Sequence, residues 1–197
     1  TRSNQITIKN YKRKKYMCGI VGITSTKEVT SRIIGSLKKL EYRGYDSAGI
    51  ATISENNINE VKCEGRVNEL EKNVNQIKLS GTIGIGHVRW ATHGKPSTIN
   101  AHPHSSDNVS VVHNGIIENS TILKKILEKK GYKFKSQTDT EVIVHLVTDY
   151  LKKNNLKDTI IKVLKKLHGS FALGIIFKDQ PDLIIGARRG SPLAVGY

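Results

Sequence analysis

The order of strand-like and helix-like segments predicts an α+β fold, with two antiparallel sheets and helices packed outside or between them. Apolar spacing indicates strands first, then helices, then strands again. This order lacks the strict βαβ alternation of a doubly wound parallel sheet. A hydrophobic content of 37% over 197 residues is sufficient for a buried core, so one domain or a tight pair is expected.

The first half of the chain shows strand and helix patterns in turn. Alternating small and β-branched residues predict strands, whereas apolar residues three and four apart predict helices. The expected strands are 18–24, 48–54, 58–63 and 82–88, and the expected helices are 28–40 and 67–77. The turn between the second and third strands is expected at Asn56–Asn57.

The second half opens with residues 89–108, a stretch rich in His, Pro, Ser, Thr and Asn that shows no periodicity. A loop of that length in a compact domain is uncommon and is typical of a functional segment. Beyond it, the expected strands are 109–113, 132–135, 170–177, 182–187 and 192–196, and the expected helices are 119–130, 138–150 and 156–167.

The formal net charge is +15, and the first 16 residues supply +6 of it without a single Asp or Glu. A basic arm for nucleic acid or an anionic membrane is one interpretation. The favoured one is a leader that is not part of the mature domain. The remaining +9 lies largely on predicted helix faces without interleaved aromatics. No nucleic-acid or membrane partner is therefore expected.

Cysteine use and hydropathy indicate the compartment. Two cysteines in a chain of this length argue against a disulfide framework and for a reducing, cytoplasmic setting. The segment before Met17 lacks the apolar central region of a secretory signal. No run of 18 apolar residues occurs that could span a membrane.

Cys18 directly follows Met17, the only methionine of the chain. If Met17 and the residues before it are removed, Cys18 carries a free α-amino group next to its thiol. An α-amine has an ordinary pKa of about 7.7–8, so it can act as a base near neutral pH. The alternative is that both residues are ordinary apolar residues that open a strand.

Asn114–Gly115 follows a strand-like segment and runs toward a helix. An Asn amide and a Gly backbone N–H can both point at one developing oxyanion, and Gly permits close approach. Asn-Gly is also the commonest short hairpin turn, and that alternative stays open.

Charged residues indicate how a substrate could be held. Arg89 at the start of the long loop could bind a carboxylate through two hydrogen bonds, and Trp90 could cover a small ligand. Asp139 at a predicted helix start could bind an ammonium group. When each residue is considered alone, the favoured explanation is structural: a surface Arg, a core Trp, and an N-cap or first-turn acid of a helix.

Two patterns in the sequence could indicate a cofactor site, but neither matches a known motif. His102 and His104 are two positions apart without a Cys or acid at ligand spacing, so no metal is expected. The glycine-rich segment 81–86 matches neither dinucleotide nor P-loop motifs and lies within a predicted strand. No cofactor is expected.

Several segments together resemble the glutaminase domain of the glutamine–fructose-6-phosphate aminotransferase (isomerising) family, which makes glucosamine 6-phosphate. The resemblance runs from Met17 to Tyr197 and is specific because several long motifs occur in the same order. The motifs lie in 18–22, 40–49, 87–94, 100–104, 111–119 and 138–141. This family belongs to the N-terminal-nucleophile (Ntn) amidotransferases, so the resemblance implies a four-layer αββα sandwich.

The resemblance also implies a role for each matching residue. Cys18 is the nucleophile that forms a γ-glutamyl thioester, with its own amine as the base. Asn114 and Gly115 form the oxyanion hole. Arg89 and Asp139 hold the α-carboxylate and α-ammonium groups of glutamine.

Other family positions match as well. Trp90, Thr92 and His93 lie on a loop that closes over glutamine and helps guide ammonia. Arg43 supports the nucleophile end of the site.

The chain departs from the family pattern at both ends. Residues 1–17 precede Cys18 and place its nitrogen in a peptide bond, so activity is expected only after they are removed. The isomerase half is absent, and the glutaminase domain at 18–197 is expected to be truncated. Fructose 6-phosphate binding and most of the contacts of an expected homodimer then lie outside this chain.

Two alternatives remain from the sequence. A sibling amidotransferase would also use a leading Cys and an Asn-Gly pair. A basic binding protein without activity, on the same fold, would show damage at the site residues, and none is seen.

Overall fold

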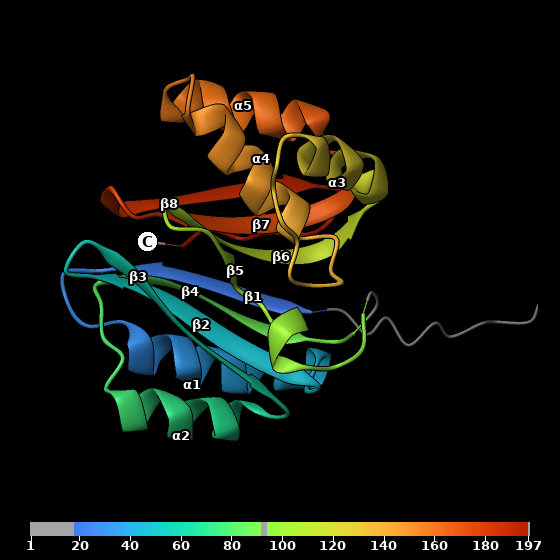
Figure 1. The fold of residues 1–197 in the computed structure, drawn as a ribbon. Helices are drawn as coiled ribbons and strands as arrows, with labels where there is room; N and C mark the ends of the chain where they lie inside the picture. The colour runs from blue at the N-terminus through green and yellow to red at the C-terminus, as the bar shows by residue number, and fades with distance from the viewer. Residues whose placement is uncertain (1–17, 92–93, 197) are drawn as a thin grey trace, which may run out of the picture.

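The computed structural model describes residues 18–91 and 94–196, which form four layers (Figure 1). Two four-stranded sheets face each other, and helices cover the outer face of each sheet. Neighbouring strands within each sheet run antiparallel. The α+β class and the four-layer αββα sandwich expected from the sequence are confirmed.

The first sheet has the strand order β1-β4-β2-β3. Its elements are β1 (Gly19–Thr24), β2 (Ser47–Ser54), β3 (Asn57–Glu64) and β4 (Ile83–Arg89), covered by α1 (Thr30–Leu40) and α2 (Val67–Ile77). A short 3₁₀ turn, η1 (Glu41–Arg43), follows α1. Apolar side chains of both helices pack with those on the outer face of the sheet in one buried cluster.

The second sheet has the strand order β5-β6-β7-β8. Its elements are β5 (His104–Ser105), β6 (Val109–Ile117), β7 (Gly169–Phe177) and β8 (Gln180–Arg189), covered by α3 (Ser120–Lys129), α4 (Glu141–Leu151) and α5 (Leu156–Lys166). The long loop before β6 contains a 3₁₀ turn, η2 (Thr98–Asn100), and β5. The larger buried cluster joins these helices to the outer face of this sheet.

The glycine-rich segment of β4 has a packing role. A Cβ atom on Gly84 or Gly86 would lie 2.8 Å or 2.6 Å from the side chain of Ile33 on α1. Real Cβ atoms do not approach that closely, so these glycines allow the helix to lie directly on the strand. The segment is therefore explained by helix–sheet contact.

The side chains that fill the space between the sheets change from apolar to polar along β4. Side chains alternate between the two faces of a strand, so Ile83, Ile85, His87 and Arg89 all face the second sheet. Ile83 and Ile85 join a buried apolar cluster with Val112 of β6. His87 and Arg89 follow on the same face and are also buried. The two sheets thus meet through an apolar contact at one end and a polar one at the other.

Three sequence expectations about the strands were wrong. β6 continues through Asn114 and Gly115 to Ile117, because all three residues pair with β7. Residues 132–135 form no strand, because Tyr132 and Phe134 pack on the helix cluster instead. Residues 192–196 also form no strand, and Val195 is 76% exposed.

The hairpin turn lies one residue earlier than expected. Ser54 pairs with Asn57, so Glu55 and Asn56 form the turn, with φ values of 50° and 58°. A two-residue hairpin with positive φ at both positions matches the twist of its strands.

No helix within the described residues is long and apolar enough to cross a membrane.

Candidate active site

Strand register brings the predicted site residues to one end of the space between the sheets. Gly19 of β1 pairs with Val88 of β4, so Cys18 lies beside Arg89 at the end of the first sheet. Asn114 follows Val112 by two residues on β6 and so faces the first sheet. The nucleophile candidate and the oxyanion candidate therefore face each other from different sheets.

A narrow pocket of about 20 Å³ joins most of these residues and has room for about one water molecule. It is lined by Cys18, Arg89, Trp90, His102, His113, Gly115, Thr138, Asp139 and Thr140. Five of the sequence-predicted site residues line it, namely Cys18, Arg89, Trp90, Gly115 and Asp139. Thr92 and His93 were also predicted, and they lie outside the described residues.

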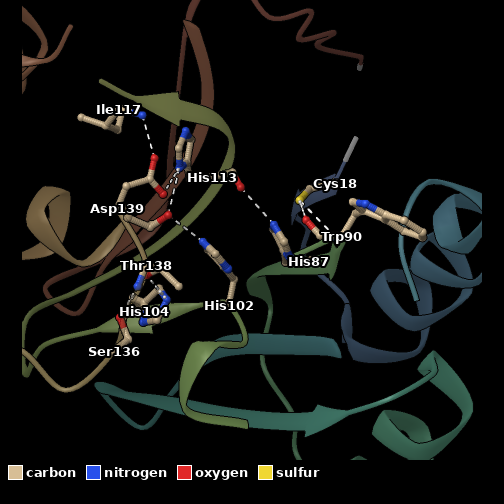
Figure 2. A network of polar contacts seen from close by, with 11 residues as sticks. Cys18, His87, Trp90, His102, His104, His113, Ile117, Ser136, Thr138 and Asp139 are labelled. Atoms are coloured by element: carbon tan, nitrogen blue, oxygen red, sulfur yellow. Dashed lines mark hydrogen bonds and ion pairs between the residues drawn. The ribbon is translucent and has the colours of Figure 1, made fainter. Parts of the chain in front are cut away.

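Cys18 is held by the backbone of Trp90 and by the side chain of Arg43. The N–H of Trp90 donates to Cys18 Sγ at 3.4 Å, and Sγ lies 3.6 Å from the Trp90 carbonyl oxygen (Figure 2). The Nε of Arg43 donates to the Cys18 carbonyl oxygen at 3.2 Å. The thiol position is thus fixed relative to the first residues of the long loop, and Arg43 lies at the nucleophile end as expected.

Burial raises the pKa of the Cys18 thiol above its ordinary value, while the Trp90 N–H and the charge of Arg89 act in the opposite direction. Burial disfavours the charged thiolate because the site excludes most water. At neutral pH the thiol is therefore protonated, and a nucleophilic role requires a base close to Sγ.

Arg89 and Asp139 supply opposite charges to the pocket. Arg89 is 3% exposed, and its guanidinium donates to the Gly94 carbonyl oxygen at 3.0 Å. The Asp139 carboxylate accepts from the N–H of Ile117 at 2.7 Å and lies 3.9 Å from Nδ1 of His113. Asp139 precedes the N-cap residue of α4, so it does not cap that helix.

Gly115 has φ of +139°, and a Cβ atom there would lie 2.1 Å from the carbonyl oxygen of Ser170. Only glycine fits that position. Asn114 is 8% exposed and pairs with Ala172 of β7. The pair thus lies inside a strand, and the hairpin-turn interpretation of Asn114–Gly115 is wrong.

The loop that carries Trp90 rests on residues that sequence reasoning did not single out. A Cβ atom on Gly44 would lie 2.4 Å from the carbonyl carbon of Arg89 and 2.6 Å from the nitrogen of Trp90. The Asp46 N–H donates to the Arg89 carbonyl oxygen at 3.2 Å, and its carboxylate accepts from the N–H of Ala91. The sequence feature that could have indicated this turn is a Gly and an Asp two residues apart in a polar segment.

Figure 2 shows His87, His102, His104 and His113; all four are buried, and His102 and His113 line the pocket. The Nε2 atom of His102 lies 2.7 Å from Thr140 Oγ1, and that of His104 lies 2.9 Å from Thr138 Oγ1. Burial lowers the pKa of His104 to about 3, so this ring is neutral. Within residues 18–91 and 94–196, no group of three or more His, Cys, Asp or Glu is arranged to hold a metal ion.

A two-sheet sandwich with a cysteine at the start of its first strand and a Gly-containing oxyanion candidate opposite defines a class II, Ntn-type glutamine amidotransferase. The chain belongs to this family: the sequence profile described as "Glutamine amidotransferase domain" matches residues 88–194, more than half of its length.

Curated relatives make the similarity more specific. The chain is 55% identical over 182 residues to a glutamine–fructose-6-phosphate aminotransferase (isomerizing) of Clostridium acetobutylicum, covering 91% of this chain. It is also 55% identical over 183 residues to the protein of that name from Mesorhizobium japonicum, covering 92%. The match spans only 30% of the length of each relative.

A solved structure with a similar fold has a different name. The glutamine phosphoribosylpyrophosphate amidotransferase of B. subtilis, in complex with ADP and GMP, matches with a TM-score of 0.70 and 32% identity. The match covers 81% of this chain and 35% of that one. The sandwich is therefore shared with a second amidotransferase.

Proposed function

We propose that this chain hydrolyses the side-chain amide of glutamine and releases ammonia, with Cys18 as the nucleophile. The observation that carries the proposal is the pocket in which Cys18, Arg89, Gly115 and Asp139 meet. Together they supply a nucleophile, an oxyanion donor and two opposite charges, as an acyl-transfer site for an amino acid requires.

The reaction begins when the free α-amine of Cys18 takes the proton of Sγ through a water molecule. Sγ then attacks the amide carbon, and the negative charge that develops on its oxygen is stabilised by Gly115 N–H and the Asn114 amide. The C–N bond breaks as the amine returns the proton to the departing ammonia. A γ-glutamyl thioester remains on Cys18. Water attacks this carbonyl and gives a proton to the α-amine, the C–S bond breaks, the amine returns the proton to Sγ, and glutamate leaves.

The base in this scheme explains why the residues before Cys18 matter. In the sequence as given, the Cys18 nitrogen belongs to the peptide bond with Met17, and an amide nitrogen is not a base. Burial of the thiol raises its pKa, so the thiol does not ionise by itself at neutral pH. We therefore propose that residues 1–17 are removed in the active form.

Substrate selection follows from the two charges. Arg89 would bind the α-carboxylate and Asp139 the α-ammonium group, which fixes the amino-acid end of the substrate. Asparagine is one methylene shorter, so its amide would fall short of Cys18 when both charges are engaged. The pocket of about 20 Å³ must widen to admit glutamine.

The acceptor of the ammonia is a further part of the proposal. Relatives that are 50–55% identical are named glutamine–fructose-6-phosphate aminotransferase, whereas the phosphoribosylpyrophosphate amidotransferase is 32% identical. This difference favours fructose 6-phosphate as the acceptor. The chain would then be the glutamine-hydrolysing part of a longer homodimeric enzyme that starts amino-sugar synthesis.

Glutamate release tests the proposal. The protein with Cys18 as its first residue is expected to convert glutamine to equimolar glutamate and ammonia, and to leave asparagine intact. A Cys18→Ala variant should show no release above buffer. Full hydrolysis by that variant would exclude Cys18 as the nucleophile. A folded, inactive wild-type protein that bound nucleic acid instead would support the binding-protein alternative.

A further inference from the structure

One histidine side chain crosses the space between the sheets next to the pocket. His87 lies on β4, two residues before Arg89 and paired with Ile20 of β1. Its Nε2 lies 2.9 Å from the carbonyl oxygen of His113 on β6 (Figure 2). His113 directly precedes Asn114, so this contact joins the strand next to the nucleophile to the strand of the oxyanion candidates.

The direction of this hydrogen bond is fixed. A carbonyl oxygen can only accept, so Nε2 of His87 carries the proton and donates. Burial lowers the pKa of His87 to about 3, which keeps the ring neutral at physiological pH. His87 is 0% exposed, and the bond is shielded from competing water.

The ring of His87 is also held from behind. It stacks on His102 with 4.2 Å between ring centroids and 15° between planes. Nε2 of His102 lies 2.7 Å from Thr140 Oγ1, and the same hydroxyl lies 2.9 Å from Nδ1 of His113. His87, His102, Thr140 and His113 thus form a closed ring of contacts. Thr140 directly follows Asp139.

We propose that His87 is a positioning residue that sets the distance between Cys18 and the oxyanion donors Asn114 and Gly115. The proposal rests on the proposed function. The apolar contacts between the sheets have no preferred direction, whereas a hydrogen bond fixes both distance and orientation. Oxyanion donors act only within about 2.7–3.1 Å of the oxygen, so a small separation of the sheets removes their effect.

His87 itself does not perform the chemistry. It is not among the residues that line the pocket, and its side chain reaches a backbone carbonyl. Its loss should therefore lower kcat through misplaced donors. The reactivity of Cys18, which depends on its contacts with Trp90 and Arg43, should be retained.

Two pairs of variants test this in the active protein that begins at Cys18. His87→Gln retains an amide N–H near the position of Nε2, whereas His87→Asn carries the same amide on a shorter side chain that cannot reach His113. His87→Leu removes the donor altogether. His145→Leu is the control, because His145 is a partly buried histidine on α4 that lies outside this network. Folding of each variant is verified by thermal melting.

The measurements are kcat and KM for glutamine and the rate of Cys18 alkylation by iodoacetamide. His87→Asn and His87→Leu should lower kcat on the order of 100-fold, as misplacement by about 1 Å does, with alkylation within about twofold of the wild type. The kcat of His87→Gln should be at least about tenfold higher than that of His87→Asn or His87→Leu. The kcat of His145→Leu should match that of the wild type.

Other outcomes overturn the inference. It is wrong if His87→Asn keeps kcat within about twofold of the wild type, or if alkylation and kcat fall in parallel. It is also wrong if kcat of His87→Gln is no higher than that of His87→Asn, because the length of the side chain then has no effect. An inactive wild-type protein would instead contradict the proposed function.

Discussion

The backbone N–H of Trp90 points at the thiol of Cys18, with 3.4 Å between the nitrogen and Sγ. The carbonyl oxygen of the same residue lies 3.6 Å from Sγ. Trp90 can therefore accept a hydrogen bond from the thiol through its carbonyl oxygen, and its N–H can donate one to the thiolate. The loop segment Arg89–Ala91 is thus part of the site through its backbone.

The first prediction concerns the ionisation of this thiol. Burial raises the pKa of Cys18, so its alkylation should have a higher midpoint pH in the folded protein than in urea. The measurement is the iodoacetamide rate against pH for the chain that begins at Thr1, in a Cys63→Ala background. An equal or lower midpoint in the folded protein would show that the Trp90 N–H and Arg89 outweigh burial.

The second prediction concerns the support of the loop. Gly44→Ala places a Cβ atom within 2.4 Å of the Arg89 carbonyl carbon and must displace that backbone. It should lower stability by about 1–3 kcal/mol and glutamine kcat by at least about tenfold. Urea unfolding and steady-state kinetics measure the two effects.

The control for this variant is Gly35→Ala in α1. A Cβ atom on Gly35 meets nothing within 4 Å, so the change should leave kcat unaltered and stabilise the helix by about 0.5–1 kcal/mol. Equal effects of the two substitutions would mean that close packing at Gly44 does not hold the loop.

The third prediction concerns substrate charge. Asp139→Asn retains an oxygen that can accept from Ile117 N–H, so folding should survive. Loss of the negative charge should raise KM for glutamine about 10- to 100-fold, the value of a hydrogen bond to a charged group. Asp182→Asn on the exposed surface of β8 is the control. If Asp139→Asn leaves KM unchanged, Asp139 does not bind the ammonium group.

The fourth prediction concerns acid stability. Burial opposes ionisation of Glu141, but the His145 ring 3.5 Å away and hydrogen bonds from Lys135 and Ser136 outweigh it and lower the pKa from 4.5 to about 2. The folded state thus favours the carboxylate, and its stabilisation is present above pH 4.5 and lost as pH falls toward 2. The shift corresponds to at most about 3 kcal/mol.

Glu141→Gln tests this assignment. The variant should be less stable than the wild type at pH 6, and the difference in unfolding free energy should shrink steadily between pH 4.5 and about 2. Urea titrations across this range measure it. A difference that is independent of pH would mean that the ionised form of Glu141 is not favoured by folding.

Local patterns were sufficient for much of the fold. The apolar spacing in α1 and α2 predicted both helices within a few residues, because each of them buries one apolar face. The motifs around Cys18, Arg89 and Asp139 pointed to residues that do line one pocket. These residues could be predicted because the side chains in each motif indicate a chemical role without knowledge of the fold.

Contacts between distant segments were not predictable in the same way. Asn114 and Gly115 resemble a turn until β7 is known to pair with them. The role of Gly44 depends on how closely the Arg89 backbone approaches it. His87 resembled an ordinary strand residue, because neither its burial nor its partner on the other sheet is encoded locally.

Glutamine hydrolysis compared between two N-termini tests the central claim most directly. One protein begins at Cys18, and the other retains residues 1–17 with the rest of the sequence unchanged. We expect equimolar glutamate and ammonia from the first protein only, because only its Cys18 has an amine that can act as the base. Equal rates from both proteins would contradict it, since the amide nitrogen of Cys18 in the second cannot accept the thiol proton.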